Sequence, residues 1–503
     1  MNSPLTAAPS ICHAARSQRP AIGPSFFDRV GLGVAFIFWL ASLSISAADS
    51  PGYVVVVSAK TKAKPEWNRV VLALASKHTG RALTFEASVE EILPELRRIF
   101  PRHICFVAQP EEATREFVAQ VHRLTRRLDD DPYTDCFWGI VTGYDAANAL
   151  RIAQGAAPLT IRKVAAGTSI PLENCEEGVW YSEVKKNQAV RKRKGQQAVE
   201  ERGPDDTTKS LVDWLNDHRP DLFVTSGHAT ARDWQIGYAY KNGSFRCENG
   251  KLYGLDTTGR RFPIESSNPK VYLPVGNCLM GHIDSQNAMA LAFMNSAGVV
   301  QMIGYTVNTW YGYAGWGCLD YFLEQPGRFT LAEAFVANDQ ALVYRLVTYF
   351  PELLGAEIDP DGRTKAQINP GAKAQSAGLT RQDGRGLLYD RDVLAFYGDP
   401  AWEARLAATP SRWDQTLARE GDVWTLELKL NRGARSFQVV DPNGSQRGGR
   451  PVIEFLPCRV KAAEVLAGAD LSPLITDDFV LMPIPDKCEP GQIYRVVFRA
   501  APR

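Results

Sequence analysis

The chain lacks an excess of charge of either sign. Its 503 residues include 57 Lys and Arg against 56 Asp and Glu, which leaves a net charge of +1 at neutral pH. A protein that holds nucleic acid through the phosphates carries a basic bias, so we expect no nucleic-acid partner. Hydrophobic residues make up 45% of the chain and charged residues 22%, as in a globular protein with a sizeable core.

A long apolar run is also lacking. Residues 30–43 are apolar, but this stretch is short for a comfortable membrane span. It follows three arginines and precedes the small residues 44–48, a pattern typical of a secretory signal peptide cleaved near Ala48. An uncleaved membrane anchor is the alternative. No cysteine stands at the expected cleavage point, which argues against a bacterial lipoprotein. We therefore expect a secreted, periplasmic or cell-envelope protein of a bacterium, without integral membrane association after cleavage.

Cysteine is sparse and scattered. Of nine cysteines, Cys12 falls in the signal segment. Cys105 and Cys136 stand inside apolar runs, where buried thiols are expected. Cys458 and Cys488 share the C-terminal segment and are candidates for a disulfide after export.

Strand-like and helix-like segments alternate after the signal segment. Apolar runs predict buried strands at residues 53–57, 103–108 and 136–142, and helical spacing predicts helices at residues 67–78, 113–128 and 145–154. The alternation resumes further on, with strands predicted at 222–226, 271–275, 299–303 and 392–397 and helices at 209–216, 286–296 and 331–347. This order predicts an α/β fold, a mostly parallel sheet flanked by helices.

Two segments interrupt the alternation. Residues 185–201 are polar and include a run of four basic residues, so we expect a solvated loop or helix face. Residues 358–386 are rich in Gly, Pro, Asp and Lys, which predicts a loop insertion.

The pattern changes near residue 411. Residues 422–430 alternate with period two, and short strand-like runs follow at 437–440, 452–455, 479–482 and 493–498. Evenly spaced short strands without helices predict a β-sandwich. The expected domains are a signal peptide (1–48), an N-terminal α/β subdomain (49–160), a catalytic α/β subdomain (161–408) and a C-terminal β-sandwich (409–503).

Two predicted strands end in a small residue and then a reactive one. The first runs into Gly227 and His228, and the second into Gly276, Asn277 and Cys278. In open α/β sheets, the edge at the carboxyl ends of the strands carries the functional site. A histidine and a cysteine at that edge are the parts of a thiolate hydrolase. Taken singly, each residue is as well explained by burial in a core.

Four sequence blocks together resemble the gingipain-type cysteine peptidases of the caspase-like clan. They are residues 225–230 (TSGHAT), 275–278 (VGNC), 303–312 (IGYTVNTWYG) and 396–400 (FYGDP), in the family's order. Tyr397 is an insertion in the family's closing Phe-Gly-Asp-Pro. The N-terminal strands fit more loosely, and the C-terminal sandwich fits the immunoglobulin-like domain that follows the catalytic unit in this family.

The resemblance implies a cysteine endopeptidase that acts on protein or peptide through an acyl-enzyme. Cys278 would be the nucleophile and His228 the general acid and base, with the backbone N–H groups of Cys278 and Ala229 as oxyanion donors. Asp135, in the block TDCFWG, is the candidate acid that orients the histidine; its alternatives are a strand N-cap or a solvated turn carboxylate. The expected substrate pocket comprises Trp234, Asn308, Thr309, Trp310 and Tyr311. No cofactor is required, and a structural calcium ion is implied by the resemblance alone.

Alternatives remain open at this stage. Ala229 replaces the glycine that follows the histidine in the family, which favours a catalytically inactive binding or scaffold protein as the alternative to a peptidase. A transpeptidase of the same fold is a further possibility. Cys278, His282 and His228 would also suit zinc, but a fourth ligand is lacking, and a catalytic cysteine explains the pattern more simply.

The resemblance also bears on specificity. Ala314 stands where lysine-specific gingipains have an aspartate, and a buried lysine head needs a paired carboxylate. We therefore expect an uncharged or aromatic residue before the cut. Asp284 and Asp320 are the alternatives for a pocket carboxylate.

Overall fold

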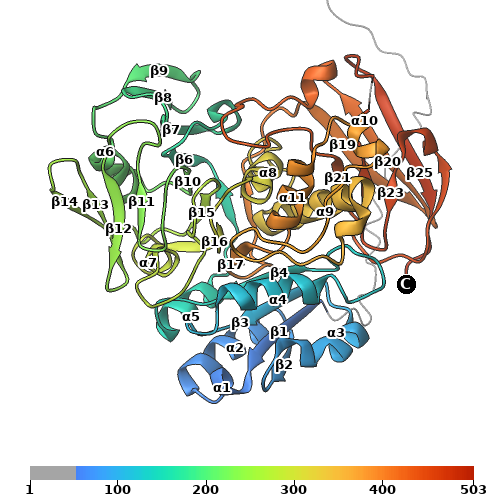
Figure 1. Ribbon diagram of the computed structural model, residues 1–503, viewed down its shortest axis with the longest axis horizontal. Helices are drawn as coiled ribbons and strands as arrows, with labels where there is room; N and C mark the ends of the chain where they lie inside the picture. The colour runs from blue at the N-terminus through green and yellow to red at the C-terminus, as the bar shows by residue number, and fades with distance from the viewer. Residues whose placement is uncertain (1–51, 486) are drawn as a thin grey trace, which may run out of the picture. The chain divides into compact units, whose positions relative to one another are not determined.

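The computed structural model describes residues 52–485 and 487–503, which belong to one compact unit. The predicted signal peptide, residues 1–48, lies outside the described residues. Within them, twelve strands form one large sheet (Figure 1). In spatial order these strands are β2 (Arg81–Phe85), β1 (Tyr53–Ser58), β3 (His103–Val107), β4 (Phe137–Val141), β17 (Leu394–Tyr397), β16 (Val299–Tyr305), β15 (Lys270–Pro274), β10 (Leu222–Thr225), β6 (Lys163–Ala166), β7 (Glu177–Tyr181), β8 (Gln188–Lys192) and β9 (Val199–Arg202).

The sheet consists of two parallel blocks. Strands β2, β1, β3 and β4 are parallel neighbours, and so are β16, β15, β10, β6 and β7. Strand β17 lies between the blocks. It pairs antiparallel with β16 and meets β4 at one residue pair, Tyr397 with Ile140. The parallel strands could be predicted from the sequence because, like β1, they are buried on both faces and consist of continuous apolar runs.

Helices accompany the strands as the alternation predicted. They are α1 (Ala59–Lys62), α2 (Pro65–Lys77), α3 (Leu93–Ile99), α4 (Arg115–Thr125), α5 (Ala146–Gln154), α6 (Thr208–Asp213), α7 (Met289–Ser296), α8 (Tyr313–Phe322) and α9 (Leu331–Tyr349). Helix α2 packs on α5, and α8 packs on α9 and against β15 and β16. The predicted fold class, a mostly parallel sheet flanked by helices, is confirmed.

Two predicted loops contain regular structure. Residues 185–201 include β8 and β9, which extend the sheet as an antiparallel hairpin in which Arg191 pairs with Glu201. These strands lie at the sheet edge, where both faces are largely solvated. Their residues are therefore polar, and the sequence did not predict strands here. Residues 358–386 include α10 (Ala372–Ser376) and the beginning of α11 (Arg381–Asp390), which Thr380 caps.

An antiparallel sheet that the sequence reading did not anticipate follows His228. Its strands are β11 (Asp233–Gln235), β12 (Ser244–Glu248), β13 (Lys251–Leu255) and β14 (Arg261–Ile264). A further two-stranded sheet joins β5 (Leu159–Ile161) to β18 (Ala404–Leu406).

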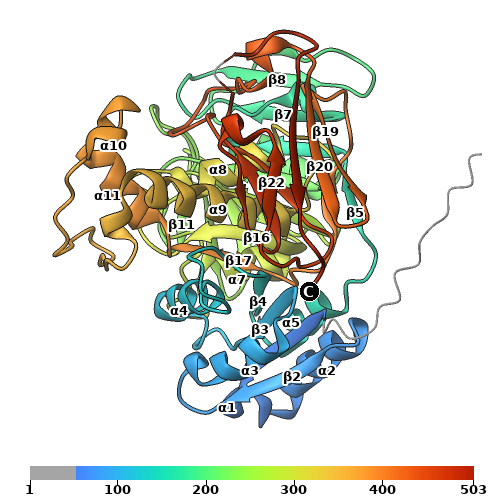
Figure 2. The same ribbon diagram turned by 90° about the vertical axis from the view of Figure 1, so that its right-hand side faces the viewer.

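The C-terminal segment forms two antiparallel sheets, drawn in red and orange in Figure 2. One contains β19 (Trp413–Glu420), β20 (Val423–Leu430), β25 (Ile493–Arg499) and β22 (Glu464–Ala467), and the other β21 (Val452–Phe455), β24 (Phe479–Met482) and β23 (Leu474–Ile475). A shared hydrophobic core that includes Trp424, Val480 and Phe498 joins them into the predicted sandwich. Residues 437–440, predicted as a strand, form none. Among the described residues, no helix has the length and apolar character that crossing a membrane requires.

Candidate active site

The carboxyl ends of five parallel strands gather polar residues at one edge of the sheet. Each polar residue follows its strand within four positions: Thr168 follows β6, Glu183 follows β7, His228 follows β10, Cys278 follows β15, and Asn308 and Thr309 follow β16. Since these strands are mutually parallel, their carboxyl ends lie on the same side. This is the edge where α/β sheets carry binding and catalytic groups.

The strands that lead to His228 and Cys278 are direct neighbours. Strand β10 pairs with β15 in parallel register, with Thr225 opposite Pro274. The buried side chain of Asn277 joins the two strand ends: it accepts a hydrogen bond from Thr225 Oγ1 (2.6 Å) and donates one to the carbonyl of Gly227 (3.0 Å). The backbone segments that carry His228 and Cys278 therefore start from two adjacent strand ends that Asn277 holds together.

Cys278 stands on a sharp turn. The next residue, Leu279, has a φ of +56°, a left-handed conformation that is unusual for a leucine. Its N–H donates to the carbonyl of Val307 (3.0 Å). The Cys278 side chain is half-buried, and its Sγ accepts the N–H of Thr309 at 3.2 Å. This contact holds the sulfur beside the segment that follows β16.

His228 is exposed and lies flat against an aromatic ring. Its imidazole stacks on Tyr238, with ring centroids 4.7 Å apart. The backbone N–H groups of Tyr238 and Ala239 both donate to the carbonyl of Glu183 (2.5 and 3.0 Å). Among the described residues, no hydrogen bond joins the His228 ring to Cys278. Catalytic pairs are often looser before substrate binds.

Glu183 is a candidate site residue that the sequence reading missed. Its side chain is 6% exposed. Oε1 accepts hydrogen bonds from Thr168 Oγ1 (3.0 Å) and Asn443 Nδ2 (3.3 Å), whereas Oε2 has no partner among the described residues. A Cβ added at Gly227 would lie 3.4 Å from Oε2, so this oxygen faces the residue before His228. Burial raises the pKa of Glu183.

Two backbone donors are available beside these groups. Within the described part of the chain, neither Ala229 nor Cys278 donates its backbone N–H to another residue. Ala229 pairs with Trp234 in an isolated antiparallel bridge, whose hydrogen bonds come from the flanking Thr230 and Gln235. Ala229 thus keeps an unused N–H at this position.

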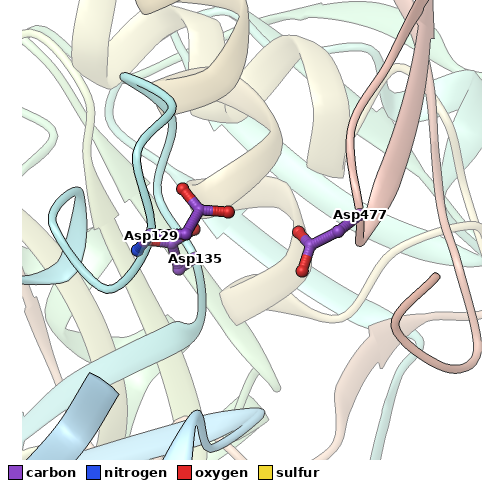
Figure 3. A group of neighbouring side chains, drawn as sticks. All are labelled: Asp129, Asp135 and Asp477. Atoms are coloured by element: carbon purple, nitrogen blue, oxygen red, sulfur yellow. The ribbon is translucent and has the colours of Figure 1, made fainter. Parts of the chain in front are cut away.

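Asp135 does not orient His228 in this structure, which corrects the sequence-based assignment. It precedes β4, and its carboxylate accepts the backbone N–H groups of Leu128 (2.9 Å) and Asp129 (3.3 Å). Burial raises its pKa. Figure 3 shows it with Asp129 and Asp477, whose ligand oxygens lie within 4.8 Å of one another. Asp135 is therefore a turn carboxylate, but a buried one (3% exposed) and not the solvated one of the alternative.

The expected pocket residues divide into two groups. Trp234 is fully buried: its Nε1 donates to the carbonyl of Ser226 (2.7 Å), and its ring packs against Phe245. It is a core residue, which corrects the prediction. The remaining four are at least partly accessible and lie in one segment next to Cys278, and they are Asn308, Thr309, Trp310 and Tyr311.

An aromatic wall stands at this segment. Trp310 is 50% exposed and stacks on Tyr389 with centroids 5.2 Å apart. The Tyr389 hydroxyl donates to the carbonyl of Asn308 (3.1 Å). Burial raises the pKa of Tyr389, and the nearby Cys278 adds to this effect, so the tyrosine stays a neutral neighbour of the sulfur.

None of the carboxylates considered for the pocket is free to receive a basic side chain. Ala314 is buried in α8, where its N–H donates to Asp390 (3.1 Å). Asp320 is buried and pairs with Arg447 (2.6 Å) and Arg450 (3.2 Å). Asp284 pairs with Arg232 (2.6 Å).

Two cavities flank the loop that carries Cys278. One, of about 740 Å³, is lined by residues after β1, β3 and β4 and by Ile283–Gln286 without reaching Cys278 itself. The other, of about 210 Å³, reaches Val307 and Tyr389, which both border the cysteine loop.

The zinc alternative finds no ligand set. Among the described residues, the side chains of Cys278, His282 and His228 do not converge on a common point, and the one convergent group is Asp129, Asp135 and Asp477. Arg459 forms an ion pair with Asp477 of that group (3.1 Å) and another with the neighbouring Asp478 (3.7 Å).

Comparisons with known proteins add little beyond the architecture. No family model matches the chain, and no curated protein matches its sequence. Among solved structures, the chain is similar to the Arg-specific cysteine proteinase gingipain R (RGPB), at 10% identity and a TM-score of 0.39 over 87% of this chain and 92% of that one.

Proposed function

We propose that this protein is an exported cysteine endopeptidase with Cys278 as nucleophile and His228 as general acid and base. The observation that carries the proposal is the pairing of β10 with β15, which delivers a histidine and a cysteine to one sheet edge from two strand ends joined by Asn277. The resemblance of the surrounding sequence blocks to gingipain-type peptidases supports the same chemistry.

The reaction follows from the groups at this edge. The Cys278 thiolate attacks the carbonyl carbon of the scissile bond, and the N–H groups of Cys278 and Ala229 bind the oxyanion. His228 protonates the leaving amine. It then takes a proton from the water that hydrolyses the acyl-enzyme; an amine in place of water makes the enzyme a transpeptidase.

Glu183 takes the role first given to Asp135. Its backbone carbonyl holds Tyr238, on which the His228 ring stacks, and its unpartnered Oε2 lies beside Gly227. A buried carboxylate stabilises an imidazolium that forms close to it. Glu183 is thus a positioning residue for His228.

The proposal also assigns a segment that is removed before the enzyme works. Export through the signal peptide leaves a mature chain that begins near Ala48 or Asp49, and N-terminal sequencing of secreted material tests this. Recovery of Met1 in a membrane fraction favours the anchor instead.

Activity measurements on site variants test the chemistry. A peptide library incubated with the mature protein identifies a cleaved substrate, on which Cys278→Ala and His228→Ala each reduce kcat by about 10³-fold or more. The matched control is Cys247→Ala, a partly exposed thiol whose Sγ donates to the carbonyl of Asn287 (2.9 Å). Turnover near that of the wild type in either site variant excludes the mechanism. No cleavage by the wild type favours the scaffold alternative.

A further inference from the structure

A segment of the C-terminal domain reaches the candidate active site. Residues 440–448, which we call the C-terminal strap, contain no helix or strand. Buried ion pairs anchor the strap: Arg447 pairs with Asp320 (2.6 Å) and with Glu324 (2.9 Å). The Val440 N–H also donates to Glu324 (3.0 Å). The strap is thus held at Val440 and at Arg447, and the residues between these two anchors are held in place.

The residues between these anchors contact the site itself. Asn443 Nδ2 donates to Thr168 Oγ1 (2.7 Å) and to Glu183 Oε1 (3.3 Å). Ser445 Oγ donates to the carbonyl of Tyr311 (3.0 Å), in the segment that lies beside Cys278. Contacts from one strap therefore reach both the histidine side and the pocket side of the edge.

We propose that the C-terminal strap is a working part of the active site, and that Asn443 is a positioning residue that acts on His228 and Cys278 through Glu183. This inference rests on the proposed function. It makes the C-terminal sandwich a contributor to catalysis rather than an appended module, because Asn443 and Ser445 are supplied by that domain alone.

The electrostatics of Glu183 explain why an amide at position 443 matters. Burial raises the pKa of Glu183, and the hydrogen bonds from Thr168 and Asn443 oppose this. Burial and, more weakly, the carboxylate raise the pKa of Tyr240, and the groups that hydrogen-bond to the carboxylate are neutral. The charged groups that contact Asn443 do so through its backbone: Asp441 accepts its N–H (2.9 Å), and Arg447 donates to its carbonyl (2.7 Å). Removing the Asn443 donor therefore lets burial protonate Glu183 at a higher pH, which removes the negative charge that the proposed mechanism uses to offset the charge His228 gains during the reaction.

The alkylation of Cys278 by iodoacetamide tests this without a substrate. The rate is followed by mass spectrometry as a function of pH in the full mature chain. We expect Asn443→Ala to slow alkylation about threefold to tenfold near pH 6 and to move the acid limb of the profile to higher pH. Asn443→Asp adds a like charge beside Glu183 and is expected to move the acid limb of the profile to still higher pH. The control is Asn431→Ala, an exposed amide of the same domain that bonds Asp414.

A double-mutant cycle separates positioning from general loosening of the fold. In a Glu183→Gln background, adding Asn443→Ala changes the rate less than about twofold, because the shared partner is gone. Two results overturn the proposal. One is that the pH profiles of Asn443→Ala and Asn443→Asp coincide with that of the wild type; the other is that Asn443→Ala slows alkylation as much in the Glu183→Gln background as in the wild type. Failure of the proposed function gives a different result: in the wild-type protein, iodoacetamide then alkylates Cys278 no faster than the partly exposed Cys247.

Discussion

The side-chain amide of Asn277 donates a hydrogen bond to the carbonyl of Gly227 over 3.0 Å. These residues directly precede the candidate nucleophile and the candidate base, so one buried amide sets the separation of the two strand ends. Gly227 has a φ of +101°, a conformation that only glycine adopts without strain. The backbone turn at Gly227 and the amide at Asn277 together direct His228 and Cys278 to the same edge.

Removing this amide is expected to cost both stability and activity. Asn277→Ala leaves the Thr225 hydroxyl without its 2.6 Å acceptor and the Gly227 carbonyl without a donor, both buried. We expect a loss of about 2–4 kcal/mol in the free energy of unfolding, measured by urea denaturation. Asn277→Asp keeps the acceptor for Thr225 but buries a carboxylate against the Gly227 carbonyl, so its kcat falls and its loss of unfolding free energy grows as pH rises and the carboxylate ionises. Wild-type turnover in both variants contradicts this role.

Two aspartates at the end of α11 are expected to give opposite pH dependences of stability. Burial raises the pKa of Asp390 to about 7, above its value near 4 in the unfolded chain. The folded state then holds the proton longer, so the stabilisation is present at low pH and is lost as pH rises from about 4 to about 7. Relative to Asp390→Asn, the wild type loses about 1 kcal/mol of unfolding free energy per pH unit in this window.

Asp392 is the matched comparison. Arg126 (2.5 Å) and Arg391 (2.9 Å) pair with it and hold its pKa well below the usual range. Its stabilisation is therefore present above about pH 4 and is lost as pH falls further. Urea titrations of Asp392→Asn from pH 3 to pH 8 should show the deficit relative to the wild type growing as pH rises from 3 and then levelling off. Parallel pH profiles for the two variants are incompatible with these assignments.

The aromatic wall predicts the residue preferred before the cut. Trp310 is half-exposed and backed by Tyr389, and the carboxylates considered for a basic side chain are engaged. A library profile dominated by uncharged or aromatic residues is expected, and Trp310→Ala lowers kcat/KM for the best aromatic substrate about tenfold, mainly through KM. Trp310→Phe, which keeps a stacked ring, retains most of the activity.

A profile dominated by Lys or Arg contradicts this specificity. The unpartnered Oε2 of Glu183 is then a candidate acceptor, and Glu183→Gln shows whether it receives the basic side chain. That variant would then lose the Lys or Arg preference.

The parallel strands were predictable because burial on both faces leaves uninterrupted apolar runs. Strands β1, β10 and β16 lie within a few residues of their expected bounds. Strands β8 and β9 were missed because edge strands carry polar residues, and β11–β14 because their short runs are broken by glycines and charges. Local patterns do not report which sheet a strand joins.

The site was predictable where it follows a strand end and not where it depends on long-range contacts. His228 and Cys278 come directly after apolar runs, which the sequence reveals. Asp135 was mistaken because the sequence does not reveal that three strands, β17, β16 and β15, lie between β4, which Asp135 precedes, and β10, which leads to His228. Glu183 and Asn443 are 260 positions apart, and only the folded chain brings them together.

The central claim is that Cys278 is a nucleophile activated at this edge. Its most direct test is labelling of the mature protein with a peptidyl acyloxymethyl ketone, followed by tryptic mass spectrometry of all cysteine peptides. The account predicts that Cys278 is modified at least about 100-fold faster than Cys247, and that His228→Ala removes most of this difference. Equal labelling of the two cysteines, or selective labelling that persists in His228→Ala, would contradict it.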